Sequence, residues 1–300
     1  MRAILLQMRN FEKTPAKVGF VAMVGRPSAG KSTLLNQLCG EKVSIVSAVP
    51  QTTRDAIRGI VNRERGQLVF VDTPGRYKSE KKGNRRLREI SDQAVDDSDM
   101  VLYVLDTTRS PGPEEADIAS LLAPHAERAV AALNKTDDPN ADAARSRAFL
   151  AEKLPGLAQD RCFEVSAKNG DGTDALLAAL FDMAGEGDPF YDEEFYTDQE
   201  VDFRIAEIIR EQAINRLQEE LPHSLHVEVA DAQLSTANAG RQKLWVRAFV
   251  VVERESQKGI VVGKGGAMIK EIRLASLKEL GRVFDWKIDL DLRVKAGSSR

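Results

Sequence analysis

The sequence predicts a two-domain protein, in which an α/β domain with a mostly parallel sheet and helices on both faces precedes a smaller α+β domain. Three observations lead to this prediction. The chain has 300 residues, which is long for one ordinary domain and comfortable for two. Short apolar runs alternate with helical patterns up to about residue 182. An acidic stretch then intervenes, and a different succession of helices and strands follows.

The composition favours a globular protein of a reducing compartment. The hydrophobic fraction of 42% allows buried cores, and a net charge of −3 argues against a chain that coats nucleic acid along its length. Cys39 and Cys162 are far apart, and the three histidines complete no metal-ligand pattern. No signal peptide and no stretch of about 20 apolar residues is present. The expected location is the cytoplasm, and a monomer is expected.

Four nearly continuous apolar runs predict strands of the first sheet. They are separated by helical patterns and span residues 18–25, 68–72, 101–106 and 129–134. Such runs are typical of strands that are buried on both faces of a parallel sheet.

The stretch "GRPSAGKST", residues 25–33, follows the first predicted strand and precedes a helical pattern. It fits a phosphate-binding P-loop, in which glycines let backbone N–H groups face the phosphates at a helix N-terminus. Lys31 then reaches the β- and γ-phosphates, and the Ser32 hydroxyl ligates Mg²⁺. The predicted phosphate-binding residues are Gly25, Pro27, Ser28, Ala29, Gly30, Lys31, Ser32 and Thr33.

"VDTPG", residues 71–75, ends the next buried strand. Asp72 is placed to hold Mg²⁺ through water, and the Gly75 N–H is placed to contact a γ-phosphate. On its own, an acid before Pro-Gly is a common turn, so the metal role depends on the P-loop.

Two later motifs, "NKTD" (134–137) and "SAK" (166–168), each follow an apolar strand. A carboxylate at Asp137 accepts from the N1 and N2 donors of guanine, and adenine offers no such pair. The side chain of Asn134 is suited to bind guanine and to brace neighbouring loops, while the Lys135 stem covers the base and the Ala167 N–H meets guanine O6. The predicted guanine-binding residues are Asn134, Lys135, Asp137, Ser166, Ala167 and Lys168.

These motifs, in this order at strand ends, resemble the translation-factor-related GTPases within the Ras-like G domains. The resemblance implies GTP and GDP as ligands with Mg²⁺, and a threonine that closes over the metal. Thr52 and Thr53 are both candidates, and the resemblance favours Thr53.

No catalytic side chain is assigned beyond Lys31 and Thr53. Ras-like enzymes carry a water-orienting glutamine where this chain has Arg76, so slow intrinsic hydrolysis is expected. Some relatives hold K⁺ with an asparagine where this chain has Ser28, which leaves K⁺ dependence open.

Residues 183–201, after a G domain predicted over 1–182, are interpreted as an acidic aromatic linker. No Lys or Arg occurs from Asp182 to Phe203. Its aromatic residues could pin it to a domain, and a solvated tether is the alternative. Its charge also suggests that it covers the RNA-binding surface in one nucleotide state. The aromatic residues are Phe190, Tyr191, Phe195 and Tyr196.

Residues 202–300 predict the order helix, strand, strand, helix, helix, strand. "GKGG" joins the last two helices and lacks the rest of a nucleotide site. It fits the GXXG loop of a type II KH domain, which clamps single-stranded RNA, although a plain helical turn is the alternative. Residues 241–300 carry 14 Lys and Arg against 7 Asp and Glu, which favours phosphate contacts. The predicted RNA-binding residues are Gly263, Lys264, Gly265, Gly266, Lys270 and Arg273.

Together with "EIIREQ", "LPHSLHVEV" and "VERESQKGIVVGKGGAMIKEI", these motifs make the chain similar to the Era family of bacterial GTPases over nearly its whole length. The resemblance implies binding to the 3′ end of 16S rRNA, a role in 30S subunit assembly, and peripheral contact with the inner membrane. A second hypothesis treats the C-terminal domain as a protein-interaction or membrane-surface module. A third, an ATPase, is disfavoured by Asp137. The basic cluster at 75–89 is either a solvated loop or an additional RNA contact.

Overall fold

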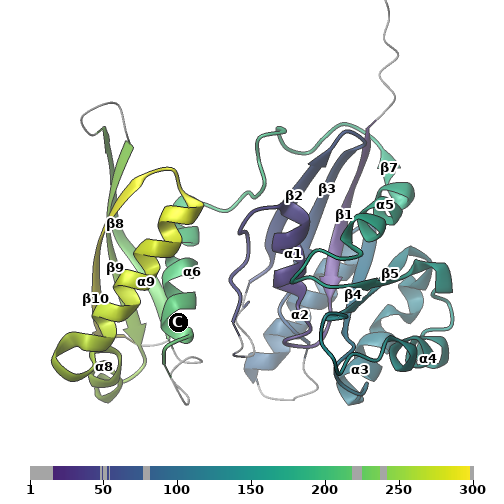
Figure 1. The fold of residues 1–300 in the computed structure, drawn as a ribbon, viewed down its shortest axis with the longest axis horizontal. Helices are drawn as coiled ribbons and strands as arrows, with labels where there is room; N and C mark the ends of the chain where they lie inside the picture. The colour runs from purple at the N-terminus through teal and green to yellow at the C-terminus, as the bar shows by residue number, and fades with distance from the viewer. Residues whose placement is uncertain are drawn as a thin grey trace, which may run out of the picture.

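The structure is a computed structural model, and it describes residues 16–47, 49, 53, 55–76, 82–217, 225–236 and 242–297. Figure 1 shows two bodies side by side, an N-terminal domain in purple to teal and a C-terminal domain in green to yellow. A single extended segment connects them at one end (Figure 1). The predicted fold class, an α/β domain followed by an α+β domain, is confirmed.

One twisted sheet forms the centre of the N-terminal domain. Its strand order is β2-β3-β1-β4-β5-β6; β2 is antiparallel to β3, and the short β7 adds antiparallel to β1. The remaining strand pairs are parallel, which confirms the prediction of a mostly parallel sheet. The strands are β1 (Lys17–Val24), β2 (Ile57–Arg63), β3 (Gly66–Asp72), β4 (Met100–Asp106), β5 (Ala129–Asn134), β6 (Cys162–Val165) and β7 (Gly185–Glu186).

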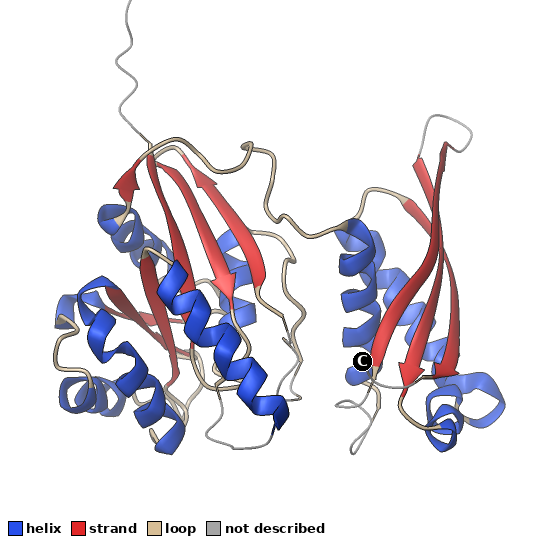
Figure 2. Cartoon of the chain, turned by 180° about the vertical axis from the view of Figure 1, so that it is seen from behind, coloured by secondary structure: helices blue, strands red, loops and turns tan. Residues whose placement is uncertain are grey.

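Helices cover both faces of this sheet. The helices are α1 (Lys31–Cys39), α2 (Lys82–Asp97), α3 (Pro113–Leu122), α4 (Ala143–Lys153) and α5 (Thr173–Met183). Val21 and Met23 of β1 pack in one core with α1 and α5, whereas Ala22 and Val24 pack in the opposite core with α2, α3 and α4. Figure 2 shows α2 lying across the face of the sheet that is turned away in Figure 1. Burial on both faces explains the continuous apolar runs in the sequence.

The C-terminal domain has the predicted element order. Its elements are α6 (Val201–Ile214), β8 (His226–Thr236), β9 (Gln242–Val252), α8 (Glu255–Val262), α9 (Ala267–Val283) and β10 (Lys287–Ala296). The sheet order is β10-β9-β8, with β9 and β10 parallel. The apolar spacing that predicted the first helix lines the core, because Ile205, Ile208 and Ile209 are buried together with residues of β9 and α9.

The connecting segment lies on the N-terminal domain. Gln67 at the start of β3 accepts from the backbone N–H groups of Phe190 and Tyr191, and the Ile60 N–H of β2 donates to the Tyr196 carbonyl at 2.9 Å. The Phe190 ring packs on Phe20 with centroids 4.7 Å apart. The aromatic linker is therefore pinned, as one interpretation of the sequence predicted, and the surface that it covers belongs to the N-terminal sheet rather than to the RNA-binding loop.

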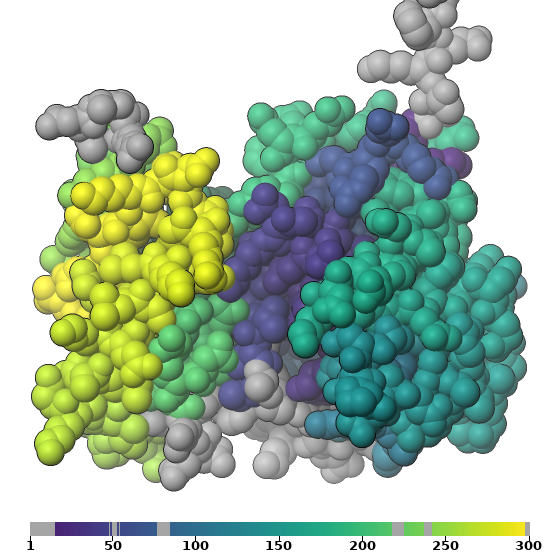
Figure 3. Space-filling view, viewed as in Figure 1, coloured from purple at the N-terminus to yellow at the C-terminus, as the bar shows by residue number. Residues whose placement is uncertain are grey.

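Helices α6 and α9 separate the C-terminal sheet from the N-terminal domain (Figure 1). Figure 3 shows yellow and green atoms of the C-terminal domain against purple atoms of the N-terminal domain. The contact includes Lys42 and Val46, in the segment between α1 and β2 that also borders the predicted nucleotide site.

Candidate functional site

The P-loop turns sharply between β1 and α1 at the edge of the sheet where the parallel strands end. Gly30 has φ 98°, a left-handed conformation that favours glycine, and a Cβ there would lie 2.2 Å from Asn134 Nδ2. Lys31 Nζ donates back across the loop to the carbonyls of Gly25 at 3.1 Å and Arg26 at 3.2 Å. Burial lowers the pKa of Lys31, and the Asp72 carboxylate acts in the opposite direction.

A cavity of about 320 Å³ opens beside this loop. Seven of the predicted phosphate-site residues line it, Gly75 included, together with Thr53 and Lys135. Residues after α1, which the sequence did not indicate, form another wall of the cavity. The lining residues are Pro27, Ser28, Gly30, Lys31, Ser32, Thr33, Ile45, Val46, Ser47, Val49, Thr53, Gly75 and Lys135.

Three predicted metal-site residues meet at this cavity: Ser32 and Thr53 line it, and the buried Asp72 bonds to Ser32. Ser32 Oγ donates to Asp72 Oδ2 at 2.7 Å and lies 3.2 Å from Thr53 Oγ1. The second oxygen, Asp72 Oδ1, is buried and has no hydrogen-bond partner among the described residues. Two hydroxyls around a carboxylate with an unused oxygen fit Mg²⁺, which prefers oxygen ligands and usually keeps several waters. Thr52, the competing candidate, lies outside the described residues.

The acid at this position is in an unfavourable environment for a charge. Burial raises the pKa of Asp72, and Lys31, Ser32 and Ser44 counteract that rise. A bound divalent cation would further favour the carboxylate. No cluster of three or more His, Cys, Asp or Glu side chains suited to a metal occurs in the described ranges, so this mixed site is the metal candidate.

The two base-recognition motifs are joined by one side chain. Asn134 Nδ2 donates to the Ala29 carbonyl of the P-loop at 2.8 Å, and Asn134 Oδ1 accepts from the Ala167 N–H at 2.9 Å. Asp137 Oδ1 accepts from Ser166 Oγ at 2.7 Å, and Lys168 Nζ lies 3.8 Å from Asp137 Oδ2. The bracing function predicted for Asn134 is thus present in the geometry, and contacts of these residues with guanine remain predictions.

The GKGG loop is exposed at the junction of α8 and α9. Gly265 and Gly266 have φ values of 60° and 81°, and a Cβ at either position would meet no described atom within 4 Å. Lys264 and Lys270 are exposed, whereas Arg273 Nε donates to the Leu290 carbonyl of β10 at 2.6 Å. Four of the predicted residues thus form an open loop with one lysine, Lys270 lies nearby on α9, and Arg273 is tied to the sheet.

Comparison with known proteins finds a family model for a part of each domain. A family model described as a 50S ribosome-binding GTPase matches residues 20–135, and a KH domain model matches residues 220–298. The GTPase Era of Treponema denticola is 50% identical over 94% of this chain and 95% of its own length. The GTPase Era of Borreliella burgdorferi is 41% identical, with 93% and 94% covered.

The chain belongs to the Era family of GTPases. It is accordingly a GTPase that uses GTP, GDP and Mg²⁺, with a G domain followed by a KH domain. A solved structure of Era in complex with MgGDPNP and nucleotides 1506–1542 of 16S ribosomal RNA matches with a TM-score of 0.86. It is 32% identical and covers 95% of both chains. An Era variant from Aquifex aeolicus bound to GDP·AlF4⁻ gives the same TM-score and identity, covering 94% of this chain and 95% of its own.

Arg76, where Ras-like enzymes carry glutamine, points away from the nucleotide cavity of this Era GTPase. Arg76 is 6% exposed, and its guanidinium pairs with Asp92 of α2 and lies 2.6 Å from Asp117 Oδ2 of α3. Only its backbone contacts the P-loop, through an N–H donated to the Gly25 carbonyl at 3.2 Å. The residue therefore anchors the loop after Gly75 and is no replacement for a water-orienting glutamine. Most of the basic cluster at 75–89 lies outside the described residues.

Two groups at the Era site escaped the sequence analysis. Ser44 donates its hydroxyl to Asp72 Oδ2 at 2.9 Å and is buried. Arg26 pairs with Asp106 at 3.2 Å, and Asp106 also accepts from Lys135 Nζ at 2.7 Å, which links the P-loop to the guanine motif. Asp106 could have been noticed because, like Asp72, it is an acid that ends a buried strand, whereas Ser44 carried no comparable signal.

In the described part of the chain, no helix is long and apolar enough to cross a membrane.

Proposed function

We propose that this GTPase is a switch that binds the 3′ end of 16S rRNA through its KH domain and assists assembly and maturation of the 30S subunit. The observation that supports the RNA ligand is the open GKGG loop, with exposed Lys264 and Lys270, in a chain whose 32%-identical relative was solved with nucleotides 1506–1542 of 16S rRNA. Glycines in left-handed conformations allow the phosphate backbone to approach the loop closely.

In the proposed nucleotide site, each motif that follows a strand has its own role in binding the phosphates, the metal or the base. Lys31 and the P-loop N–H groups bind the phosphates, and the Gly75 N–H contacts the γ-phosphate when GTP is present. Ser32, Thr53 and Asp72 hold the metal. Mg²⁺, when bound, neutralises charge that develops on the phosphate oxygens during hydrolysis. Asp137 selects guanine, with Asn134, Lys135 and residues 166–168 supporting the base.

Several finer assignments belong to the same proposal. The domain limits are 1–182 for the G domain, 183–201 for the linker and 202–300 for the KH domain. The protein acts as a monomer in the cytoplasm, with peripheral contact at the inner membrane. Hydrolysis is slow without a partner, because Arg76 stands where Ras-like enzymes carry the water-orienting glutamine and its guanidinium is engaged by two carboxylates.

The test is a titration of the full chain with a labelled single-stranded RNA that matches the 3′ end of 16S rRNA. It is run with GDP and with a non-hydrolysable GTP analogue at two salt concentrations. Tighter binding with the analogue, together with a loss of affinity at higher salt, is the expected result. Equal binding with both nucleotides would retain the RNA ligand and reject the switch.

Gly265→Asp tests the loop itself, because it adds a negative charge and a Cβ at a left-handed position. Gly281→Asp is the matched control, since it makes the same change at an exposed site near the other end of α9. We expect Gly265→Asp to abolish detectable binding and Gly281→Asp to bind like the parent. Absence of RNA binding by the parent protein in both nucleotide states would favour a protein-interaction module instead.

A further inference from the structure

The segment between α1 and β2 connects the metal site to the KH domain. We call residues 42–47 the bridging segment. Its start is fixed by Asn36 of α1, whose Oδ1 accepts from the N–H groups of Val43 at 2.9 Å and Ser44 at 2.8 Å, and whose Nδ2 donates to the Ser44 carbonyl at 2.8 Å. Three bonds to one side chain leave Ser44 little freedom. Its hydroxyl points inward, to Asp72.

Ser44 shares one oxygen of the metal-site carboxylate with Ser32. Both hydroxyls donate to Asp72 Oδ2, at 2.9 Å and 2.7 Å respectively, while Asp72 Oδ1 has no partner among the described residues. Occupying one oxygen from two sides fixes the rotation of the carboxylate and leaves the other oxygen available. Hydrogen bonds of this kind orient ligands in metal sites, and their loss typically reduces metal affinity by about 10- to 100-fold.

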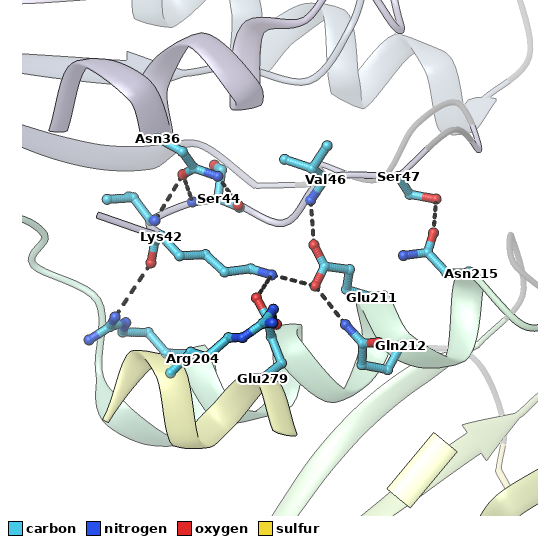
Figure 4. Close-up of polar contacts among 12 residues, drawn as sticks. Asn36, Lys42, Ser44, Val46, Ser47, Arg204, Glu211, Gln212, Asn215 and Glu279 are labelled. Carbon is cyan, nitrogen blue, oxygen red and sulfur yellow. Dashed lines mark hydrogen bonds and ion pairs between the residues drawn. The ribbon is translucent and has the colours of Figure 1, made fainter. Parts of the chain in front are cut away.

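The KH domain holds the same segment from the opposite side (Figure 4). Glu211 of α6 is 3% exposed; its Oε1 accepts from the Val46 N–H at 2.8 Å, and its Oε2 accepts from Lys42 Nζ at 2.6 Å. Lys42 Nζ also contacts Glu279 Oε1 of α9 at 2.7 Å. Ser47 Oγ donates to Asn215 Oδ1 at 2.6 Å. The contacts flank Ser44 on both sides, at Lys42 and at Val46.

These contacts do more than hold the two domains together, because they fix the backbone of the bridging segment. A carboxylate that accepts a backbone N–H fixes the path of the chain, and this N–H lies two residues from Ser44. Ile45, Val46 and Ser47 of the same segment also line the nucleotide cavity. Displacement of α6 would therefore move a wall of that cavity and the hydroxyl that orients Asp72.

We propose that Glu211 is a positioning residue of the Mg²⁺ site, through which the docked KH domain holds the bridging segment so that Ser44 orients Asp72. The inference depends on the proposed metal role of Asp72. Linkage then requires reciprocity, because a KH domain that strengthens metal binding when docked is itself held more firmly when the metal is bound.

The experiment follows the release of N-methylanthraniloyl-GDP from the full-length chain as free Mg²⁺ is varied, with an EDTA sample as the metal-free limit. Ser44→Ala should raise the Mg²⁺ midpoint for nucleotide retention by about 10-fold. Glu211→Ala should raise it by about 5-fold, and Glu211→Gln, which keeps an acceptor for the Val46 N–H, should lie between it and the parent. In EDTA all three variants should release nucleotide at the parent's rate.

Glu271→Ala is the matched control, since Glu271 of α9 pairs at 3.3 Å with Arg216, just after α6, so that this ion pair lies within the KH domain and does not involve the bridging segment. It should keep the parent's midpoint. Unchanged midpoints in both Glu211 variants, or equal acceleration with and without Mg²⁺, would overturn the inference. Asp72→Asn separates the two proposals. If nucleotide release from this variant still depends on Mg²⁺ as in the parent, the metal role of Asp72 is wrong. If that dependence is lost while the Glu211 variants behave like the parent, only the present inference is wrong.

A second measurement follows the bridging segment itself. Hydrogen exchange of the peptide over residues 42–47 should slow when Mg²⁺ is added to the GDP-bound chain, because the Val46 N–H is the donor to Glu211. In Ser44→Ala this Mg²⁺-dependent slowing should disappear. If Ser44→Ala kept the full effect, the proposed path through Ser44 would be wrong.

Discussion

Replacing Gln67 with leucine should release the linker from the G domain. Gln67 is 1% exposed, and its amide makes three bonds to the linker: Oε1 accepts from Phe190 N at 2.8 Å and Tyr191 N at 3.0 Å, and Nε2 donates to the Tyr191 carbonyl at 2.8 Å. Leucine is apolar and one atom shorter, and it can make none of these bonds. The linker would lose these three hydrogen bonds at Phe190 and Tyr191, while the contact of the Phe190 ring with Phe20 remains.

The size of the effect follows from these bonds. Each contributes about 1 kcal/mol net, which gives about 3 kcal/mol for the three. A buried leucine recovers about 1 kcal/mol through burial of apolar area, so the linker should open more easily by about 2 kcal/mol. At 1.4 kcal/mol per tenfold, the open population rises by about 30-fold. The contacts of Asn62 with the Glu193 and Phe195 carbonyls remain and keep the downstream part attached.

Limited proteolysis with chymotrypsin measures that population, because the linker presents Phe190, Tyr191 and Phe195 as cleavage sites and cleavage of a transiently open segment follows its equilibrium population. We expect cleavage in the linker to accelerate by about 30-fold, as calculated from the bond count. Gln233→Leu makes the same change at an exposed position of β8 and should cleave at the parent's rate. A rate within twofold of the parent in Gln67→Leu would show that the amide does not hold the linker, and the reasoning would fail.

Three other predictions concern the G domain. Asp137→Asn should shift preference from GDP to xanthosine diphosphate in competition with fluorescent GDP, while the Ser166 hydroxyl keeps an acceptor; retained guanine preference would contradict base recognition by Asp137. Arg76→Leu should lower the free energy of unfolding by about 1–2 kcal/mol in urea titrations, since it breaks pairs with two partly exposed carboxylates, and should leave GTP hydrolysis within about threefold; a collapse of hydrolysis would mean that Arg76 acts in the reaction. Burial alone raises the pKa of Asp106, but hydrogen bonds from Lys135 and Thr108 outweigh it and the net pKa is lowered. Because the pKa of Asp106 is lower in the folded than in the unfolded chain, its ionised form stabilises the fold at pH values above the unfolded pKa, and this stabilisation is lost as the pH falls through the folded pKa. Asp106→Asn should therefore reduce the loss of unfolding free energy below about pH 4 in urea titrations. An unchanged pH dependence of that free energy in the acid range would argue against this contribution.

The parts of the fold that the sequence predicted share a short-range signal. Apolar runs buried on both faces marked β1, β3, β4 and β5, and the polar motif after each run could then be placed at one edge of the sheet. Strand β2 was not predicted, because "IRGIVNR" mixes apolar and charged residues. It is the edge strand of the sheet and pairs only with β3, so it needs no continuous apolar run. The spacing of isoleucines in α6 predicted its buried face correctly, since helical periodicity needs no knowledge of the partner.

The groups that escaped prediction depend on long-range pairing. Ser44 and Asp72 are 28 positions apart, and Glu211 and Val46 are 165 apart. In the sequence, Glu211 belongs to the polar face of an amphipathic helix, where a solvated carboxylate is the usual expectation. Only docking of α6 on the bridging segment buries it, and nothing local in either segment specifies that docking.

The position of the linker changes where coupling between the domains has to be sought. The sequence suggested a charged linker that covers and uncovers the RNA-binding loop, but Gln67, Asn62 and Ile60 hold it along β2 and β3, on the G domain. A linker attached in this way fixes the start of α6 relative to the strand that follows Thr53. The bridging segment contacts α6 and α9 directly and reaches Asp72 through one hydroxyl. The two attachments lie on opposite sides of Thr53 in the chain, so the metal-site threonine stands between a segment bound to the KH domain and a strand bound to the linker.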